Sequence, residues 1–499
     1  MGAFESVLYG FQVALTLENI MYVFLGVLAG TVIGMLPGLG PISAIAVMIP
    51  LSYGMEPASA LILMAGVYYG AVFGGSTSSI LLNAPGVAST VATSFDGYPM
   101  AQQGKAGKAL ATAAIASFFG GTVATIGLML VAPQLSKLAI TFGPSEYFAL
   151  MLLGLTAIAS LSDGSVVKAF MSATVGIMVA TIGIDAQTGT QRFTFGSANL
   201  LDGVDFLVIA LGLFALAEVT TLIISRKESL FKKGENSIGS LKIEKSEVKE
   251  MAAPVGRQSI LGFFIGVLPG AGATIASFLA YISEKRLSKN PDSFGKGNIV
   301  GVAAPESANN AAAGGSFVPL LTLGIPGSGT TAIMLGALLV VGVQPGPMLL
   351  TDHPDVFWGV IASMYIGNIM LLVLNLPLIP YFAKILYIPK GMLISLILIF
   401  CLVGVYGVSF SKFDLYLLIL FGVIGYLMRL FSFPPAPFIL AFILGGMMEQ
   451  SFRQALSISN GSYAIFWERP ISLGLIITAF IFLVLPYVLT MFKKKFKVV

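Results

Sequence analysis

Two stretches of sequence decide the fold: "GTVIGMLPGLG" at Gly30–Gly40 and "GFFIGVLPGAG" at Gly262–Gly272. Each lies in an apolar run and ends in Leu-Pro-Gly-x-Gly. Proline has no N–H with which to continue a helix, and glycine readily adopts positive φ, so both stretches predict a helix that ends and a chain that turns. Within a bilayer, such a break is tolerated only where protein or a water-filled cavity satisfies the freed backbone groups.

The composition is that of a polytopic membrane protein. Hydrophobic residues make up 56% of the chain and charged residues only 10%, with a mean hydropathy of +0.92. Apolar runs such as Phe357–Ile379 and Ile471–Met491 are long enough to cross a hydrocarbon core. A single cysteine, Cys401, and a single histidine, His353, exclude intrachain disulfides and Cys- or His-cluster metal sites, so we expect no enzyme and no cofactor.

One polar stretch divides the chain into two apolar halves. Ser225–Arg257 holds eight Lys or Arg and five acidic residues and contains no apolar run. Its basic excess predicts a cytoplasmic location. We therefore expect a first membrane repeat over residues 1–225, a basic linker over 226–257, and a second membrane repeat with an extra C-terminal helix over 258–499.

The two halves share further landmarks in the same order. Gly-Gly-Ser occurs at positions 74–76 and 314–316, Pro-Gly follows at Pro85 and Pro326, and the related phrases "IASFFGG" and "IASMYIG" begin at Ile115 and Ile361. Three ordered landmarks, in addition to the opening phrase, indicate an internal duplication.

Charge indicates that the repeats are inverted. The loop after Pro85-Gly86 carries Lys105 and Lys108, whereas the loop after Pro326-Gly327 has only Asp352, His353 and Asp355 as ionisable groups. The positive-inside rule places the first loop in the cytoplasm and the second outside. Equivalent loops on opposite faces are typical of inverted-topology repeats.

The same rule predicts that both Leu-Pro-Gly stretches are re-entrant hairpins. Basic segments flank Ser259–Tyr281 on both sides, so this stretch enters and leaves the membrane on one face, with its bend at Leu268–Gly272. Its counterpart, Tyr22–Tyr53, enters from the opposite face. The fold class predicted is an all-α polytopic membrane protein with broken helices and about a dozen membrane-inserted elements. The other expected helices are Ala109–Ala132, Tyr147–Leu161, Val166–Ile184, Val204–Ile224, Phe357–Ile379, Met392–Val408, Asp414–Leu430, Pro435–Met448 and Ile471–Met491, the last followed by a basic, cytoplasmic C-terminus.

Small polar residues gather around the second pair of breaks. Half-helix N-termini carry partial positive charge that suits anionic substrates, while hydroxyl, amide and carbonyl oxygens suit a coupling cation. The predicted substrate-binding residues are Gly38, Gly40, Asn83, Pro85, Gly86, Ser89, Gly270, Gly272, Pro326, Gly327, Ser328, Thr330 and Thr331. The possible cation-binding residues are Ser76, Thr77, Ser78, Glu306, Asn309, Asn310, Ser316 and Thr322, and Pro37 and Pro269 are expected to break helices.

Each of these features has a structural alternative. Gly-x3-Gly in a membrane helix often serves only to pack helices closely. Ser and Thr hydroxyls often bond to carbonyls of their own helix. Glu306 is either a buried carrier of a proton or cation, or part of an aqueous loop after the basic segment.

The motifs carry a resemblance to a known family. The stretches "GMLPGLGP", "GGSTSSILLNAPG", "GVLPGAGATIASFLAY" and "LGIPGSGTTAIMLGAL", which begin at Gly34, Gly74, Gly266 and Leu323, resemble those of the large membrane subunit of bacterial tripartite tricarboxylate transporters, the TctA-like family. The resemblance covers essentially the whole chain. It implies contact roles for Pro37, Gly38, Gly40, Asn83, Pro85, Gly86, Pro269, Gly270, Gly272, Pro326, Gly327 and Ser328.

The resemblance also implies a function. It suggests uptake of a carboxylate, such as citrate, another tricarboxylate or a dicarboxylate, across the bacterial inner membrane, driven by a Na⁺ or H⁺ gradient. The expected partners are a small transmembrane subunit and a periplasmic solute-binding protein. A self-sufficient transporter or exporter is the alternative. A channel or an intramembrane enzyme is disfavoured, the enzyme because the sequence has no nucleophile–base or metal constellation.

Overall fold

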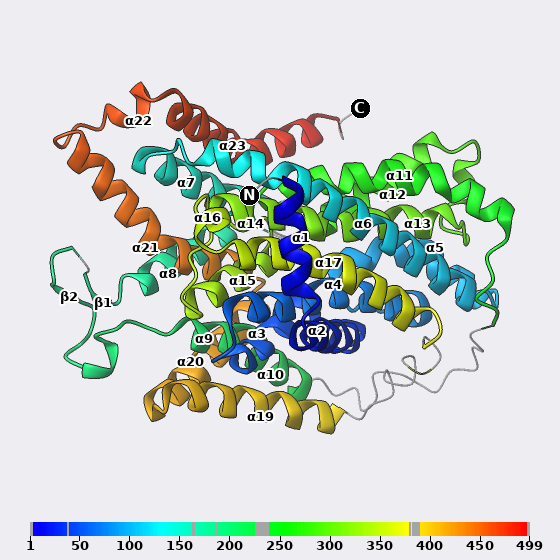
Figure 1. Cartoon of the computed structure of the whole chain (residues 1–499), viewed down its shortest axis with the longest axis horizontal. Coiled ribbons are helices and arrows are strands. Elements are labelled where there is room, and N and C mark those ends of the chain that lie inside the picture. Colours follow the sequence, from blue (N-terminus) through cyan, green and yellow to red (C-terminus); the bar gives the residue numbers. More distant parts are fainter. Residues whose placement is uncertain are drawn as a thin grey trace.

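The computed structural model describes residues 3–36, 39–161, 165–185, 187–224, 239–270, 272–378, 381 and 390–496. Figure 1 shows a molecule built almost entirely of helices, most of which run along its longest axis. Within the described residues, seven helices are long and apolar enough to cross a membrane, and five shorter apolar helices accompany them. The predicted fold class, an all-α polytopic membrane protein, is confirmed.

The first half contains helices of very different length. They are α1 (Ala3–Ala14), α2 (Leu17–Met35), α3 (Gly40–Ser52), α4 (Pro57–Leu82), η1 (Ala88–Thr90), α5 (Val91–Gln102), α6 (Ala106–Ala139), α7 (Pro144–Leu161), α8 (Val166–Ala180), η2 (Ala198–Leu200), α9 (Phe206–Ala210), the π-helix η3 (Leu211–Leu216) and α10 (Ala217–Ile224). The two-residue strands β1 (Gly183–Ile184) and β2 (Gln191–Arg192) pair antiparallel between α8 and η2.

The second half begins with two helices that flank the second Leu-Pro-Gly stretch. Its elements are α11 (Lys245–Val267), α12 (Gly272–Leu287), η4 (Pro291–Ser293), α13 (Val300–Gly315), α14 (Phe317–Leu323), α15 (Gly329–Val340), α16 (Leu349–Asp352), α17 (Pro354–Asn375), α19 (Lys390–Ser409), α20 (Lys412–Leu430), α21 (Pro435–Ile458), α22 (Ile465–Glu468) and α23 (Pro470–Phe496).

At each Leu-Pro-Gly stretch one helix ends and another begins. Helix α2 ends before the first stretch and α3 begins at Gly40 with φ +57°; α11 ends before the second and α12 begins at Gly272 with φ +61°. The legs of the second hairpin are joined at their open end, where Arg257 binds the Glu284 carboxylate at 2.7 Å and Gln258 donates to Ser283. Pro37 and Gly38 lie outside the described residues.

The Gly-x3-Gly pairs pack helices. Gly30 and Gly34 of α2 lie directly against the carbonyls of Val67 and Ala71 on α4. Their counterparts Gly262 and Gly266 lie in the same way against the carbonyls of Ala308 and Ala312 on α13. A Cβ at any of these four glycines would overlap the facing backbone, so the packing alternative holds for them.

This packing fixes how the halves correspond. Gly74 lies against Thr31, and Gly315 lies against Phe263 in the matching geometry, so Gly74 corresponds to Gly315. In this register the two Gly-Gly-Ser triplets are offset by one position. The same register also pairs the left-handed residues that end α4 and α14, which are Asn83 (φ +51°) and Gly324 (φ +68°).

The halves are interlocked at one end of the molecule. The Asp96 carboxylate of α5, fully buried, accepts hydrogen bonds from the backbone N–H groups of Gly295, Gly297 and Asn298 at 2.7–2.9 Å, just before α13. It also accepts one from the Tyr281 hydroxyl of α12 at 2.9 Å. A first-half side chain thus fixes the start of the central helix of the second half.

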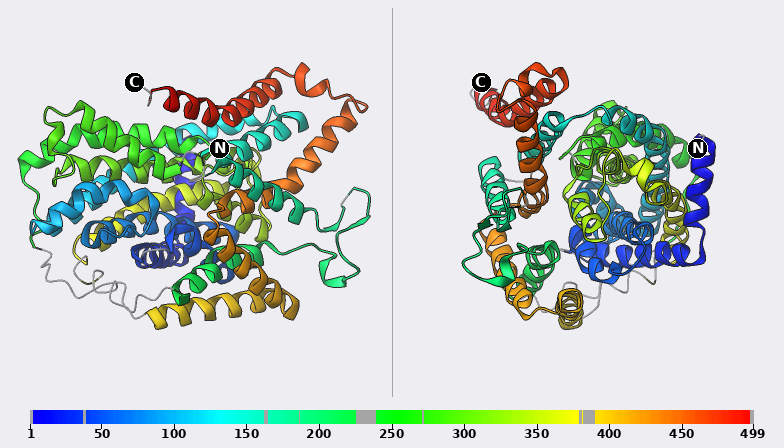
Figure 2. Two further views of the ribbon diagram at one scale, coloured as in Figure 1. Left: turned by 180° about the vertical axis from the view of Figure 1, so that it is seen from behind. Right: turned by 60° about the vertical axis from the view of Figure 1, so that its left-hand side comes forward.

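A band of outer helices lies along one side of this body. Helix α7 packs on α23, α8 on α21, and η3 on α20, and Figure 2 shows these helices beside the inner bundle. The β1–β2 hairpin projects from the band and is tied to α21 by ion pairs of Asp185 with Arg453 and of Arg192 with Glu449. The backbone N–H of Gln187 and the neighbouring Arg453 lower the pKa of Asp185 to about 2.

Several boundaries differ from those expected. Helix α5 lies between the Pro85 break and Lys105, where no helix was expected, and α11 begins at Lys245, inside the stretch assigned to the linker. Helix α21 continues to Ile458, well past Met448. The expected division into repeats and linker remains a prediction, because residues 225–238 lie outside the described part of the chain.

Candidate functional site

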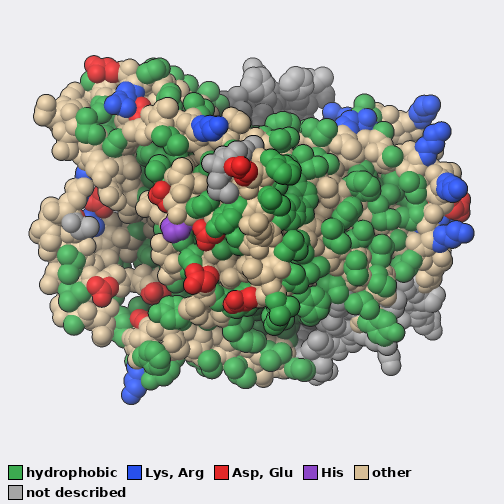
Figure 3. Space-filling view, viewed as in Figure 1, with side chains coloured by type: hydrophobic (Ala, Val, Ile, Leu, Met, Phe, Trp, Pro, Cys, Tyr) green, Lys and Arg blue, Asp and Glu red, His purple; other side chains and the backbone are tan. Residues whose placement is uncertain are grey.

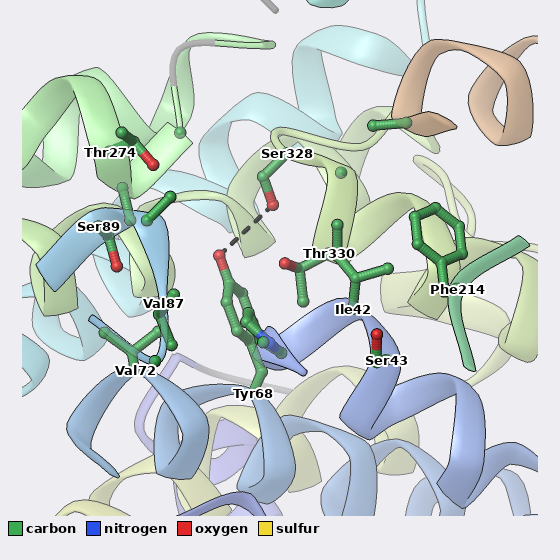
Figure 4. Close-up of a pocket in the computed structure, with 18 of the residues that line it drawn as sticks. Ile42, Ser43, Tyr68, Val72, Val87, Ser89, Phe214, Thr274, Ser328 and Thr330 are labelled. Carbon is green, nitrogen blue, oxygen red and sulfur yellow. Dashed lines mark hydrogen bonds between the residues drawn. The ribbon is translucent and has the colours of Figure 1, made fainter. Parts of the chain in front are cut away.

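The two hairpins and both Pro-Gly breaks meet at one cavity of about 510 Å³. Its inner wall comes from the start of α3, the start of α12, Tyr68 of α4, and the segments Pro85–Ser89 and Ser328–Thr330. Its outer wall comes from the band of outer helices, through residues Ile158, Phe214, Arg429 and Ala436. Figure 4 shows side chains from these elements converging on the space. The volume suits a small organic molecule.

Three helix N-termini open onto this cavity. They belong to α3, which lines it from Gly40 to Ser43, to α12, which lines it from Gly272 to Ile275, and to α15, which lines it from Gly329. The first N–H groups of a helix have no intrahelical acceptor, and the helix dipole adds partial positive charge at that end. The cavity is therefore electrostatically suited to an anion without a lysine at its centre.

Hydroxyl groups complete the inner wall. Ser89, 2% exposed, has no hydrogen-bond partner for its Oγ within the described structure. The Tyr68 hydroxyl lies 3.4 Å from Ser328 Oγ (Figure 4). It also lies 3.5 Å from Ser316 Oγ. Ser328 also caps α15, because its Oγ accepts the N–H of Thr331 at 3.2 Å. These donors are available to carboxylate oxygens that enter the cavity.

The outer wall adds a cation that the sequence analysis missed. Arg429, in the last turn of α20, lines the cavity and forms an ion pair with Glu218, which is 5% exposed at its side chain. Arg429 also donates to the Phe214 carbonyl, within the π-helix η3. Lone ionisable residues in otherwise apolar runs are a recognised sign of function in membrane helices, and both Arg429 and Glu218 show that sign in the sequence.

The structure brings most of the predicted substrate residues together. The members of that set that line the cavity are Gly40, Pro85, Gly86, Ser89, Gly270, Gly272, Ser328 and Thr330. Four others do not line it: Asn83 is the exposed cap of α4, Pro326 and Gly327 are buried behind Ser328, and Thr331 caps the Ser328 N–H. The tip of the second hairpin is fixed to its own Pro-Gly break, because Gly270 donates its N–H to the Gly327 carbonyl at 3.0 Å.

The residues predicted to bind a cation fall into two groups. Ser78, Ser316 and Thr322 donate to carbonyls of their own helices, at Gly75, Ala313 and Val318, which is the local bonding that the sequence left open. The others gather deeper in the body: Ser76 and Thr77 lie on α4, while Glu306, Asn309 and Asn310 lie on α13. All five are buried, so the aqueous-loop alternative for Glu306 is wrong.

Tyr68 is the second residue that the sequence analysis missed. It lies in α4, a helix that is buried on all sides, and no local pattern separates it from its neighbour Tyr69. Only the fold shows that Tyr68 reaches the cavity. Thr274 and Ser43 were missed as well, although their positions in the first turn after Leu-Pro-Gly-x-Gly could have indicated them.

The chain is similar to two proteins of Agrobacterium vitis. It is 46% identical over 476 residues, 95% of this chain and 94% of the relative, to an uncharacterized 52.8 kDa protein in the TAR-I ttuC′ 3′ region. It is 48% identical over 228 residues, 45% of this chain and 94% of the relative, to an uncharacterized protein in the TAR-II ttuC′ 3′ region. No solved structure matches the chain. The profile of one transporter family matches residues 20–440, a range that includes both hairpins and both Pro-Gly breaks. The chain belongs to the tripartite tricarboxylate transporter TctA family.

Proposed function

We propose that this protein is the large membrane subunit of a secondary uptake system for organic carboxylates, driven by a cation gradient. The observation that carries the proposal is the convergence of three helix N-termini and several hydroxyl groups on one cavity within a membrane protein. Discontinuous helices that point their N-termini at a carboxylate are a recurring design of secondary transporters. We propose a di- or tricarboxylate such as citrate as the substrate, because the family is one of tricarboxylate transporters.

The cavity also suggests how access alternates. It lies between the inner bundle, which carries both hairpins, and the outer band, which supplies Ile158, Phe214, Arg429 and Ala436. A ligand there would touch both bodies, so movement of one against the other would change its exposure. The matched local geometry of the two hairpins supports inverted repeats as the basis of that movement.

Charge supports a cytoplasmic location for one end of the molecule. Figure 3 shows a group of Lys and Arg side chains at the right-hand end of the molecule, and most of the acidic residues, with some further Lys and Arg, toward the left-hand end. At the basic end, Lys108 forms an ion pair with Glu247 at 2.7 Å, and Gln103 donates to the Lys296 carbonyl. Three segments that the positive-inside rule assigns to the cytoplasm therefore lie together. We propose that this end faces the cytoplasm, in a bacterial inner membrane.

Transport by the purified chain in proteoliposomes tests the proposal. We expect labelled tricarboxylate or dicarboxylate to accumulate when a Na⁺ or H⁺ gradient is imposed, and to leak out when an ionophore collapses it. Uptake that needs ATP and survives the ionophore would contradict the proposal. Adding the proposed periplasmic binding protein and small membrane subunit, and finding that uptake needs both, would distinguish a tripartite system from a self-sufficient transporter.

One substitution tests the cavity itself. Arg429→Lys keeps a positive charge but loses the planar, bidentate donor geometry, so we expect the KM for a carboxylate to rise about tenfold, with the protein still inserted. Arg469→Lys is a matched control, because Arg469 pairs with Glu146 away from the cavity. An equal change in KM for the two substitutions would contradict a role for Arg429 in binding the carboxylate.

A further inference from the structure

Glu306 is a buried carboxyl group at the centre of the inner bundle. It lies in α13 and is completely shielded from solvent. Thr93 of α5 donates its hydroxyl to Glu306 Oε1 at 2.5 Å, and Ser117 of α6 donates to Oε2 at 3.0 Å. Ser76 of α4 and Asn309 of α13 lie beside the same carboxyl group. Elements of both halves thus surround one acid.

No positive side chain meets this carboxyl group in the described structure. The charged groups in the interior of the helices packed on α13 have partners of their own: Asp96 binds backbone N–H groups and Tyr281, Lys108 pairs with Glu247, and Arg257 pairs with Glu284. Helix α4, also in contact, carries no charged residue. A buried, unpaired carboxylate is strongly disfavoured, so Glu306 needs a bound proton or metal cation in this arrangement.

A small cavity adjoins the hydroxyl groups around Glu306. It has a volume of about 10 Å³, enough for one water molecule, and both Ser76 and Ser117 line it together with Thr77 and Asn375. Ser76 is 4% exposed, and its Oγ lies beside the Glu306 carboxyl group without a hydrogen bond of normal geometry to any described residue. An unpartnered buried hydroxyl beside a water-sized space is a natural acceptor for a carboxyl O–H or for a water that delivers a proton.

Hydrogen bonds and short stretches of backbone connect Glu306 to the candidate substrate cavity. Thr93 lies on α5, whose preceding segment includes Ser89. Asn309, one turn after Glu306, donates its side-chain N–H to the Ser89 carbonyl at 3.2 Å, and Asn310 donates to Asn309 Oδ1 at 2.7 Å. A change in the charge of Glu306 therefore acts on the segment that lines the substrate cavity through both Thr93 and Asn309.

We propose that Glu306 is the proton-binding group that couples the pH gradient to transport. A hydronium ion that reaches the small cavity transfers one proton to the carboxylate, which becomes a neutral carboxylic acid, and leaves as water. In the reverse step the carboxylic acid gives that proton to a water on the other side of the membrane. The groups beside the carboxyl group are the hydroxyls of Thr93, Ser117 and Ser76 and the side-chain amide of Asn309. That set is small for a metal cation, which takes about six oxygen ligands in proteins. The inference rests on the proposed function, because it assigns the coupling ion of that transport.

Glu306→Gln in proteoliposomes tests the proposal, with exchange and accumulation measured separately. Glutamine resembles the protonated acid, so we expect the variant to exchange internal unlabelled for external labelled carboxylate at a rate within about threefold of wild type. We expect accumulation driven by an imposed pH gradient to fall by at least about tenfold, with loss of proton uptake in lightly buffered vesicles. Glu306→Asp keeps a titratable group, and we expect it to restore part of the accumulation.

Glu284→Gln is the matched control, because Glu284 is also buried but is paired with Arg257. It should retain accumulation driven by the pH gradient. Asp185, with its low pKa, stays ionised across the pH range of the assay. Normal accumulation by Glu306→Gln, or wild-type accumulation driven by Na⁺ alone and lost in this variant, would overturn the proton assignment. Absence of exchange in the wild type would instead overturn the proposed function.

Discussion

Tyr68 and Asn309 occupy equivalent positions in the two halves, yet they are chemically unlike. In the register fixed by the glycine contacts, α4 places Tyr68 where α13 places Asn309. Each reaches the Pro-Gly segment of the other half: Tyr68 approaches Ser328 Oγ at 3.4 Å, and Asn309 binds the Ser89 carbonyl at 3.2 Å. The local helix contacts of the two halves match, while the side chains at these equivalent positions differ in chemistry.

In the same register, Glu306 of the second half has an apolar counterpart in the first half. Its equivalent in the first half is Ala65, which is buried in α4. The candidate cavity is lined by matching parts of both halves, whereas the acid occurs in one half alone. A symmetric binding site with an asymmetric carboxyl group beside it is a reasonable basis for one coupled ion site in a duplicated protein.

The largest expected effect comes from a methyl group at the first Pro-Gly break. A Cβ at Gly86 would overlap the Gly34 carbonyl oxygen, whereas at Gly327 the nearest atoms lie at 2.9–3.0 Å. We expect Gly86→Ala to destabilise the protein by about 3 kcal/mol or more and Gly327→Ala by clearly less. Thermal unfolding in detergent, followed by fluorescence, measures both. Gly256→Ala is the control, because a Cβ there meets nothing within 4 Å.

The hairpin tips give the next effect. Gly270 has φ +83°, and a Cβ there would lie 2.8 Å from the Ala157 backbone; Gly272 has φ +61° but open space around it. Gly270→Ala should therefore cost about 2–3 kcal/mol, and Gly272→Ala about 1–2 kcal/mol from backbone strain alone. Equal costs would show that the tip does not pack on α7. Transport should be lost more readily than membrane insertion, and the ratio of uptake to inserted protein checks this.

The contacts of Asn309 with Ser89 and of Tyr68 with Ser328 should differ in their importance for stability and transport. Asn309→Ala leaves the buried Ser89 carbonyl without its donor, so we expect a loss of about 2 kcal/mol and a rise of roughly tenfold or more in KM for the carboxylate. Substrate titration of uptake gives the KM, and unfolding in detergent gives the stability. Asn368→Ala is a control, because it removes a similar hydrogen bond, from a side-chain amide to the Phe118 carbonyl, far from the cavity. An unchanged KM would mean that Asn309 only packs.

Tyr68→Phe should have the smallest effect. Its hydroxyl makes only long contacts, at 3.4 and 3.5 Å, and the ring stays in place against Phe317. We expect a change below about 1 kcal/mol in stability and a rise of at most several-fold in KM. A larger loss than that of Asn309→Ala would reverse the comparison and make Tyr68 the principal contact of the pair.

The sequence was most informative where proline and glycine dictate the backbone. Leu-Pro-Gly-x-Gly predicted both helix breaks, and the helix N-termini that follow them now line the cavity. It was ambiguous for Glu306, because a small-residue segment suits an aqueous loop and a closely packed helix equally well. It missed Arg429 because no local pattern tells which of the distant segments an arginine will face.

One misassignment has a simple physical cause. Asn83 resembles a ligand in sequence, since it is an amide directly before Ala-Pro-Gly. In the structure it adopts the left-handed conformation that ends α4, which turns it outward. Its counterpart is Gly324, whose φ of +68° shows that the position requires a backbone shape rather than a side chain. Asparagine is among the few residues other than glycine that adopt this shape readily.

The carboxylate of Asp96 constrains the order in which the chain can be completed. All of its acceptor capacity is used by groups between Tyr281 and Asn298, which leave the ribosome long after α5 has been made. Until then, the nascent first half carries the Asp96 carboxylate without its hydrogen-bond donors. The surface of α4, α5 and α6 that α13 covers in the finished protein is also exposed. The first half should therefore be short-lived when synthesised alone, and two separately encoded halves should each depend on the other for survival in the cell.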